Sequence, residues 1–340
     1  MTILLTGAAG FIGFHTARAL LARGETVIGV DRVDDYYDTR LKEARLAQLA
    51  GPGFTFIRAD VADCDAMLGL ADDRITHVVH LAAQAGVRFS MIDPYAYVTS
   101  NVMGQVVMLE LARKLPRLAH FLYASSSSVY GLNRALPFEE TARVDHPSSL
   151  YAATKRSGEL ISHAYGHLYG LPQTGLRFFT VYGPWGRPDM AYYGFAKAIM
   201  AGEPITLYER GRLKRDFTYI DDIVAGVLGA LDRPPAAGEG PRVLNIGNHR
   251  SETVSHLVAL LEASLGRRAV IRDVPRPAAD VEETWASVDA IGALTGFAPT
   301  TPLELGIPRF AAWFLGYHGH AGRGDASNGN LGVDRPSGSA

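Results

Sequence analysis

The chain has 340 residues, a length that suits a nucleotide-binding domain with a second, smaller lobe. With 47% hydrophobic and 20% charged residues it has the composition of an ordinary folded protein, and no apolar run approaches the ~18 residues that a membrane helix needs. The net charge is -2 and no long lysine or arginine run occurs, so we expect neither a membrane nor a nucleic acid as a partner.

Predicted strands alternate with predicted helices through the first half of the chain. The expected strands are the short β-branched or leucine-rich runs Thr2–Leu5, Thr26–Val30, Thr55–Ile57, His77–His80, His120–Tyr123 and Thr174–Phe178. Between them, Phe11–Ala22 and Asn101–Lys114 have helical length and apolar spacing. Repeated βαβ units of this kind predict an α/β fold, a Rossmann-type doubly wound parallel sheet with helices on both faces.

The regular alternation stops near Thr180, where a stretch rich in glycine and proline begins. We therefore expect residues 1–179 to form a Rossmann domain that binds a dinucleotide. Residues 180–218 and 248–317 are expected to form a smaller α/β lobe that binds the substrate.

Two later segments are assigned differently. A helix expected at Tyr219–Leu231 and a strand at Val243–Ile246 suggest that residues 219–247 return to the first domain. Residues 318–340 contain almost no apolar side chain and are predicted to be a disordered tail.

A glycine motif lies between the first strand and the first helix. Thr6–Gly13 reads Thr-Gly-Ala-Ala-Gly-Phe-Ile-Gly, which is typical of a dinucleotide-binding turn in this position. The glycines allow the tight turn, the approach of the pyrophosphate and the close packing of helix on strand, while the helix N-terminus offers free N–H groups. The spacing departs from the commoner Gly-x-Gly-x-x-Gly, so a merely structural turn is the alternative. The predicted phosphate-binding residues are Gly7, Gly10, Phe11, Ile12 and Gly13.

An acidic residue follows the second strand. Asp31 is placed to bind the adenosine ribose hydroxyls and to repel a 2′-phosphate, which favours NAD over NADP as the cofactor. Arg32 beside it could instead accept a phosphate, but we interpret it as a solvated loop residue. Further candidate contacts, each of which could also be a simple strand-end turn, are Asp60, Val61, Leu81, Ala82 and Ala83.

A tyrosine and a lysine one helical turn apart form the candidate catalytic pair. Tyr151 and Lys155 are expected on one helix face. The ammonium and a positive nicotinamide ring would lower the phenol pKa of ~10 by ~1–3 units, so that Tyr151 can accept a proton. Ser125–Ser128 lie at the carboxyl end of the fifth strand, where open parallel sheets bind ligands. A tyrosine and a lysine at this spacing are common on any surface helix, and a run of serines is usually a loop. Their combination in a NAD-binding domain indicates a catalytic site.

These motifs resemble the extended short-chain dehydrogenases/reductases that modify sugar nucleotides, and within that family the UDP-glucuronate 4-epimerases. The resemblance runs from Thr2 to about Phe314 and includes Asp35–Asp38, Ala85–Arg88, Ser125–Gly131, Thr180–Met190 and Arg215–Asp222. It implies that Tyr151 is the base, that Lys155 is its electrostatic partner, and that Ser126 hydrogen-bonds the reacting oxygen.

The reaction implied by the resemblance is isomerisation of UDP-glucuronate to UDP-galacturonate. Tyr151 removes the proton from the 4-hydroxyl while the C4 hydride passes to tightly bound NAD, and return of the hydride to the opposite face gives the epimer without net oxidation. The 4-keto intermediate is a β-keto acid that must not lose its carboxylate as carbon dioxide. The substrate contacts implied are Ser127, Ser128, Thr180 and Arg187 for the carboxylate, Arg215 for the diphosphate, Asp280 for the uridine ribose, and Arg88.

Alternative functions stay open at this point. The chain could instead be a UDP-glucuronate decarboxylase, a UDP-glucose 4-epimerase or a catalytically silent NAD-binding scaffold. Arg215 could form only a surface ion pair with Asp216. Dehydration is disfavoured, because the related dehydratases carry an acidic pair where this chain has Ser127 and Ser128.

The resemblance also implies a homodimer. Its four-helix bundle would be built from Asn101–Lys114 and Leu150–Tyr169, although both helices could equally be core. No metal is expected, since no His/Cys/Asp cluster has the spacing of metal ligands. Because Met1–Leu5 leads into a strand pattern rather than a secretory signal, the expected location is cytoplasmic.

Overall fold

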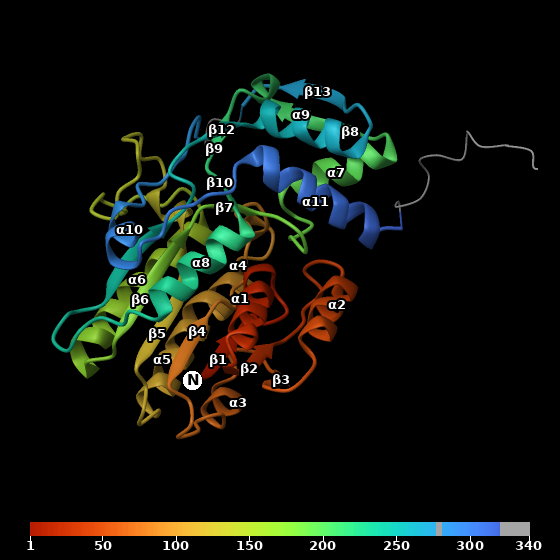
Figure 1. The fold of residues 1–340 in the computed structure, drawn as a ribbon. Helices are drawn as coiled ribbons and strands as arrows, with labels where there is room; N and C mark the ends of the chain where they lie inside the picture. Colours follow the sequence, from red (N-terminus) through yellow and green to blue (C-terminus); the bar gives the residue numbers. More distant parts are fainter. Residues whose placement is uncertain (277–280, 320–340) are drawn as a thin grey trace, which may run out of the picture.

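The computed structural model describes residues 1–276 and 281–319, which are built around a seven-stranded parallel sheet (Figure 1). Its strands are β1 (Thr2–Thr6), β2 (Thr26–Asp31), β3 (Phe54–Arg58), β4 (His77–His80), β5 (His120–Ser126), β6 (Gln173–Phe178) and β11 (Arg242–Ile246). They lie in the order β11-β6-β5-β4-β1-β2-β3, and all neighbouring pairs are parallel. The chain therefore winds outward from β1 in both directions, so the predicted Rossmann-type α/β fold is confirmed.

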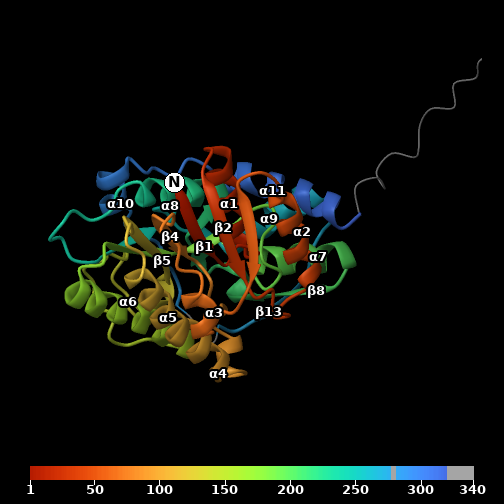
Figure 2. The same ribbon diagram turned by 90° about the horizontal axis from the view of Figure 1, so that it is seen from below.

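Helices cover both faces of this sheet (Figure 2). One face carries α1 (Phe11–Ala22) and α8 (Ile220–Leu231), and the other carries α3 (Cys64–Leu68), α5 (Gly104–Arg113) and α6 (Leu150–Tyr169). Alternate side chains of β1 supply the two cores, because successive Cβ atoms of a strand point to opposite faces. Ile3 and Leu5 pack with α1 and α8, whereas Leu4 packs with α5.

A second group of elements lies at the upper end of the molecule in Figure 1. Three two-stranded sheets pair β7 (Thr180–Tyr182) with β10 (Phe217–Tyr219), β9 (Lys214–Arg215) with β12 (Glu252–Thr253), and β8 (Pro204–Tyr208) with β13 (Val270–Val274). The helices of this group are α7 (Ala191–Ala201), α9 (Val254–Leu265) and α11 (Leu303–Tyr317). Tyr182, Tyr192 and Phe310 extend the apolar core of the α1 face into these elements.

Shorter segments complete the description. They are α2 (Thr39–Leu49), α4 (Pro94–Tyr97), α10 (Asp289–Thr295), the 3-10 helices η1 (Phe89–Met91), η3 (Ser127–Tyr130) and η4 (Glu209–Gly211), and the π-helix η2 (Val98–Met103). α2 packs beside α1, and α10 packs against α8. Within the described ranges, no helix is both long and apolar enough to cross a membrane.

The structure differs from the sequence expectation at the start of two helices. The helix expected at Asn101–Lys114 begins as the π-helix η2. In this wider turn, Asn101 lies between the segment after β4 and the helix α6. The Asn101 amide donates to Gln84 O and Thr154 Oγ1 at 3.0 Å each. Tyr219 pairs in β10 rather than starting α8.

The predicted tail is described only at its start. His318 follows α11 and shares a 2.9 Å hydrogen bond with the hydroxyl of Tyr193, so it belongs to the packed structure. Residues 320–340 lie outside the described part of the chain.

Candidate functional site

A tight turn joins β1 to α1. Gly7 has φ +76°, a region that residues with a Cβ seldom adopt, and a Cβ on Gly13 would lie 2.0 Å from the carbonyl oxygen of Gly7. Only glycine therefore lets the helix start this close to the strand. The first helical bond, from Phe14 N to Gly10 O, leaves the three preceding N–H groups without a partner inside the helix. This helix N-terminus is a site for an anion, which fits the predicted pyrophosphate contacts.

Asp31 lies at the end of β2, beside the same turn. Its carboxylate accepts hydrogen bonds from Ala9 N at 3.1 Å and from Val33 N at 2.8 Å. Burial raises the pKa of Asp31, while these two N–H donors act against that rise. Val33 has φ +54°, a strained conformation for a β-branched residue and one that clusters at functional sites.

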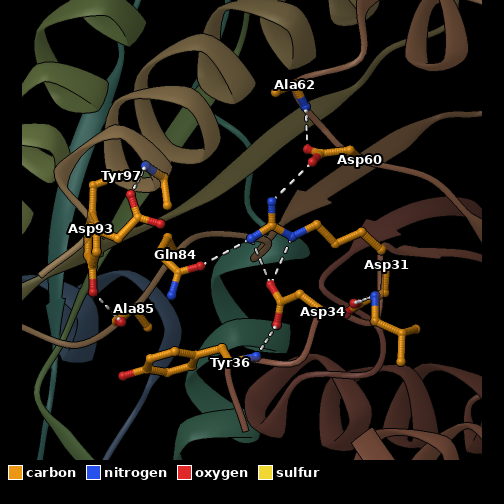
Figure 3. Close-up of polar contacts among 12 residues, drawn as sticks. Asp31, Asp34, Tyr36, Asp60, Ala62, Gln84, Ala85, Asp93 and Tyr97 are labelled. Atoms are coloured by element: carbon orange, nitrogen blue, oxygen red, sulfur yellow. Dashed lines mark hydrogen bonds and ion pairs between the residues drawn. The ribbon is translucent and has the colours of Figure 1, made fainter. Parts of the chain in front are cut away.

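Arg32 is not the solvated loop residue expected from the sequence. Its guanidinium donates to Asp34 at 2.8 Å, to Asp60 at 3.1 Å and to the Gln84 side-chain oxygen at 3.1 Å. Figure 3 shows these three acceptors around one guanidinium. Because two carboxylates and an amide already occupy its donors, Arg32 is poorly placed to receive a 2′-phosphate. The arrangement favours NAD over NADP.

The other predicted cofactor residues lie at the carboxyl ends of β3 and β4. Asp60 also accepts a bond from Ala62 N, as Figure 3 shows, and Val61 is buried. Ala82 N donates to Thr6 Oγ1 at 3.2 Å. A Cβ on Gly7 would lie only 2.8 Å from Ala82 N, so the chain after β4 runs directly along the glycine turn. The neighbouring predicted contacts, Leu81 and Ala83, are partly buried in the same segment.

The three predicted catalytic residues lie together. Ser149 caps α6 by accepting a hydrogen bond from Ala152 N, and the first turns of α6 then carry Tyr151 and Lys155. Lys155 Nζ donates to Ala124 O at 3.0 Å, which places the amine against the end of β5. Ser126 is the last residue of β5, and its hydroxyl is near enough to act on the pKa of Tyr151.

The electrostatics of this cluster differ in part from the expectation. Burial raises the pKa of Tyr151, and the nearby hydroxyl of Ser126 only opposes that rise. The predicted lowering also counted a positive nicotinamide ring, and the protein groups alone do not produce it. Burial and the positive charge of Arg187 lower the pKa of Lys155 to about 8. At neutral pH Lys155 is therefore still mainly an ammonium, which stabilises a phenolate nearby.

A buried ion pair that the sequence analysis missed fixes α6 to the sheet. Arg177 on β6 donates to the two carboxylate oxygens of Glu159 at 2.8 and 2.9 Å, and Ser125 Oγ donates to the same carboxylate at 2.6 Å. Glu159 lies one turn after Lys155, and Ser125 directly precedes Ser126. The ion pair and the Ser125 hydrogen bond thus fix α6, which carries Tyr151 and Lys155, relative to β5, which carries Ser126. Its only sequence signal is an arginine inside an otherwise buried strand.

A second cation lies close to the catalytic pair. Arg187 Nε donates to Asp189 Oδ1 at 3.0 Å, and a second guanidinium nitrogen donates to Oδ2. The hydroxyl of Tyr36 donates to the same carboxylate at 3.2 Å. The charge of Arg187 acts on the pKa of both Tyr151 and Lys155. An arginine near a candidate base is suited to bind an anionic group of the substrate.

Two of the remaining predicted substrate residues follow β5 directly. Ser127 and Ser128 form the first turn of η3, and Ser126 Oγ donates to Ser128 Oγ at 3.2 Å. Thr180 begins β7, where its N–H donates to Asp216 O at 3.1 Å. Arg88 donates to the hydroxyl of Tyr208 on β8 at 3.2 Å, so it bridges the two groups of elements.

Arg215 lies on β9, and its Nη1 donates to Lys214 O at 2.7 Å. The alternative role for Arg215, a surface ion pair with Asp216, is wrong because the Asp216 carboxylate is fully buried. That carboxylate accepts hydrogen bonds from Asn248 N at 2.7 Å and Ala286 N at 3.1 Å. Asp280 lies outside the described residues.

Comparison with known proteins matches residues 3–247 to the NAD dependent epimerase/dehydratase family. The chain belongs to this family. Among its relatives, UDP-glucuronate 4-epimerase 1 of Arabidopsis thaliana is 47% identical over 335 residues, which cover 94% of this chain and 78% of the relative. The resemblance inferred from the motifs is therefore confirmed.

Solved structures of this epimerase/dehydratase family are similar over nearly the whole chain. The UDP-glucuronic acid 4-epimerase of Bacillus cereus, in complex with UDP-glucuronic acid and NAD, has a TM-score of 0.86 at 34% identity and covers 93% of this chain and 100% of its own. The UDP-glucose 4-epimerase of Thermotoga maritima, with UDP-glucose, has a TM-score of 0.82 at 29% identity, and the match covers 94% of this chain and 100% of its own. The glycine turn, the start of α1 and Asp31 fit the dinucleotide that gives the family its name.

Proposed function

We propose that this chain is an isomerase, a UDP-glucuronate 4-epimerase that holds NAD tightly and converts UDP-glucuronate to UDP-galacturonate without net oxidation. The observation that carries the proposal is the Arg187 guanidinium, which two hydrogen bonds to Asp189 hold near enough to act on the pKa of both Tyr151 and Lys155. A sugar carboxylate needs such a partner, and a neutral hexose does not. The 47% identity with an Arabidopsis UDP-glucuronate 4-epimerase supports the same substrate.

The chain's own residues hold the cofactor and move one proton. The N-terminus of α1 holds the diphosphate of NAD, Asp31 holds the adenosine ribose, and the segments after β3 and β4 lie along the rest. When bound, NAD accepts the hydride of sugar C4 and returns it. Ser126 and Tyr151 hydrogen-bond the 4-oxygen, and Tyr151 takes its proton while the ammonium of Lys155 stabilises the phenolate.

Retention of the carboxylate distinguishes the proposed reaction from decarboxylation. Once C4 is a ketone, carbon dioxide leaves only if the C5–C6 bond aligns with the carbonyl π-system. We assign Arg187, Ser127, Ser128 and Thr180 to hold the carboxylate out of that alignment. Arg215 is assigned to the diphosphate of UDP, Asp280 to the uridine ribose, and Arg88 to the UDP-sugar.

The test compares two substrates. Purified protein is incubated with UDP-glucuronate or with UDP-glucose, and the products are separated by chromatography with mass detection. We expect UDP-galacturonate of unchanged mass from the first and far slower turnover of the second. Arg187→Gln should reduce turnover of the uronate much more than turnover of UDP-glucose, because only the uronate carries a carboxylate. A product lighter by carbon dioxide would instead indicate a decarboxylase, and faster turnover of UDP-glucose would indicate a UDP-glucose 4-epimerase.

We also propose a homodimer. The helices α5 and α6 lie side by side on one outer face (Figure 2), and apolar side chains on and before them are exposed, among them Val98, Met103, Leu160 and Leu168. Pairing with the same helices of a second copy would bury them in a four-helix bundle. Light scattering should give twice the chain mass, and Leu160→Glu should shift it toward the monomer. The cytoplasmic location stays a prediction from the sequence.

The division into a NAD-binding domain, residues 1–179 with 219–247, and a UDP-sugar lobe, residues 180–218 with 248–317, is part of the same proposal. It is supported by β11, which joins the central sheet beside β6, and by α8, which packs on α1.

A further inference from the structure

A fully buried arginine lies between the glycine turn and the segment that precedes Arg187. Arg45 on α2 has 0% of its surface exposed. Its Nη1 donates to Ala9 O at 2.8 Å, and its Nη2 donates to Trp185 O at 2.6 Å and to Gly186 O at 3.0 Å. One side chain thus joins residues that are far apart in the sequence.

The charge of this arginine is not matched by a carboxylate within the described chain. The acceptors of Arg45 there are main-chain carbonyls and the hydroxyl of Tyr37, and none of the ion pairs formed by described residues includes it. The neighbouring His15 is neutral, because burial, with the positive charges of Arg18 and Arg45, lowers its pKa to about 3. A buried cation among neutral acceptors is costly unless an anion completes the site.

The nearest place for such an anion is the glycine turn. The N–H of Ala9 donates to Asp31, and the carbonyl of Ala9 accepts from Arg45, so both polar groups of this residue are fixed. Gly10 follows directly and caps α1, whose free N–H groups form the anion site. Arg45 therefore contacts the peptide unit that directly precedes this anion site.

The guanidinium of Arg45 also fixes the segment directly before Arg187. Trp185 has φ +61°, an uncommon conformation for a non-glycine residue, and its carbonyl accepts two of the hydrogen bonds from Arg45. A Cβ on Gly186 would lie 1.8 Å from the hydroxyl of Tyr192, so the chain is tightly confined there. Arg187 is the next residue, and its direction depends on this confined backbone.

We propose that Arg45 is a positioning residue that couples the two halves of the site. Its charge is completed by the diphosphate of NAD, and its planar fork fixes Trp185 and Gly186 so that Arg187 meets the substrate carboxylate. The substrate half of this inference rests on the proposed function, whereas the NAD half does not.

The test separates charge from geometry with two substitutions and one control. Arg45→Met removes both the charge and the fork. Arg45→Lys keeps the charge but loses the planar fork that reaches the carbonyls of Ala9, Trp185 and Gly186 together. Arg40→Met on the same helix is the matched control, because the Arg40 side chain is 87% exposed. Titration calorimetry on protein stripped of NAD gives the Kd for NAD, and kinetics at saturating NAD give KM and kcat for UDP-glucuronate.

We expect Arg45→Met to weaken NAD binding by about tenfold or more and to raise KM, as loss of a charge-assisted contact does. Arg45→Lys should keep the Kd for NAD within about threefold while raising KM more than it lowers kcat. Arg40→Met should change neither. The inference is overturned if Arg45→Met binds NAD within about twofold of the unsubstituted chain, or if Arg45→Lys leaves KM unchanged. Should Arg45→Met fail to fold, the Kd for NAD and the KM of Arg45→Lys decide whether the inference holds. Failure of the unsubstituted chain to bind NAD would instead refute the proposed function.

Discussion

Replacement of Glu159 by alanine should destabilise the fold strongly. Glu159 is 3% exposed and Arg177 is 2% exposed, and the pair forms two hydrogen bonds. Ser125 and Arg156 donate to the same carboxylate. Burial acts to raise the pKa of Glu159, but these donors outweigh it and lower the pKa below its ordinary value. The variant therefore leaves a buried guanidinium without its carboxylate.

The expected cost follows from that loss. Removing one partner of a buried ion pair costs ~3–5 kcal/mol, because the remaining charge stays out of water. Urea unfolding at pH 7, followed by circular dichroism, should show this decrease in the free energy of unfolding. Since the pKa of Glu159 is lowered on folding, its contribution is present above the unfolded value of ~4.3 and is lost as the pH falls through the folded value. The difference between the two proteins should thus shrink in acid.

A surface ion pair supplies the control. Glu43 and Arg58 are both about half exposed, so Glu43→Ala should cost less than ~1 kcal/mol. The double variant Glu159→Leu with Arg177→Met should recover much of the loss, because it leaves no buried charge. A cost for Glu159→Ala no larger than that of Glu43→Ala would refute the reasoning.

Three further outcomes are expected. Gly13→Ala should abolish NAD binding because its Cβ would lie 2.0 Å from a carbonyl oxygen, whereas Gly194→Ala, whose Cβ meets nothing within 4 Å, should bind NAD normally in the same titration. Asp31→Asn should weaken NAD by about tenfold without admitting NADP, measured by calorimetry with both nucleotides, since two carboxylates occupy the adjacent guanidinium. In pH profiles of kcat/KM, activity should fall above a pKa of about 8 as Lys155 loses its proton, and Arg187→Gln should move this limb to higher pH because the charge of Arg187 helps to lower that pKa. If the alkaline limb of the Arg187→Gln profile lies at the same pH as that of the unsubstituted chain, the predicted effect of Arg187 on Lys155 is contradicted.

Local signals explain why much of the fold could be predicted from the sequence. The glycine turn and the apolar spacing gave the bounds of α1, Phe11–Ala22, as the structure has them. The first six strands of the large sheet differ from the predicted runs by no more than a few residues at either end. The tyrosine and lysine spacing placed the catalytic pair on one helix because residues four apart share a face. Each of these signals lies within a few neighbouring residues.

The missed features depend on contacts between distant segments. The acceptors of Arg45 include Ala9 and Trp185, which a single sequence does not connect with it. Arg32 looked solvated because Asp60 and Gln84 come from other strand ends, and only the sheet order brings them to it. The predicted pKa of Tyr151 counted charges but not burial, which tertiary packing decides.

The most direct test of the account uses UDP-glucuronate with deuterium at C4. Purified protein is incubated with it in ordinary water without added NAD, and the product is analysed by mass spectrometry and NMR. We expect UDP-galacturonate that keeps its deuterium at C4, because the hydride leaves and returns within one site. Release of the deuterium into water, or a product that has lost carbon dioxide, would contradict epimerisation through retained NAD.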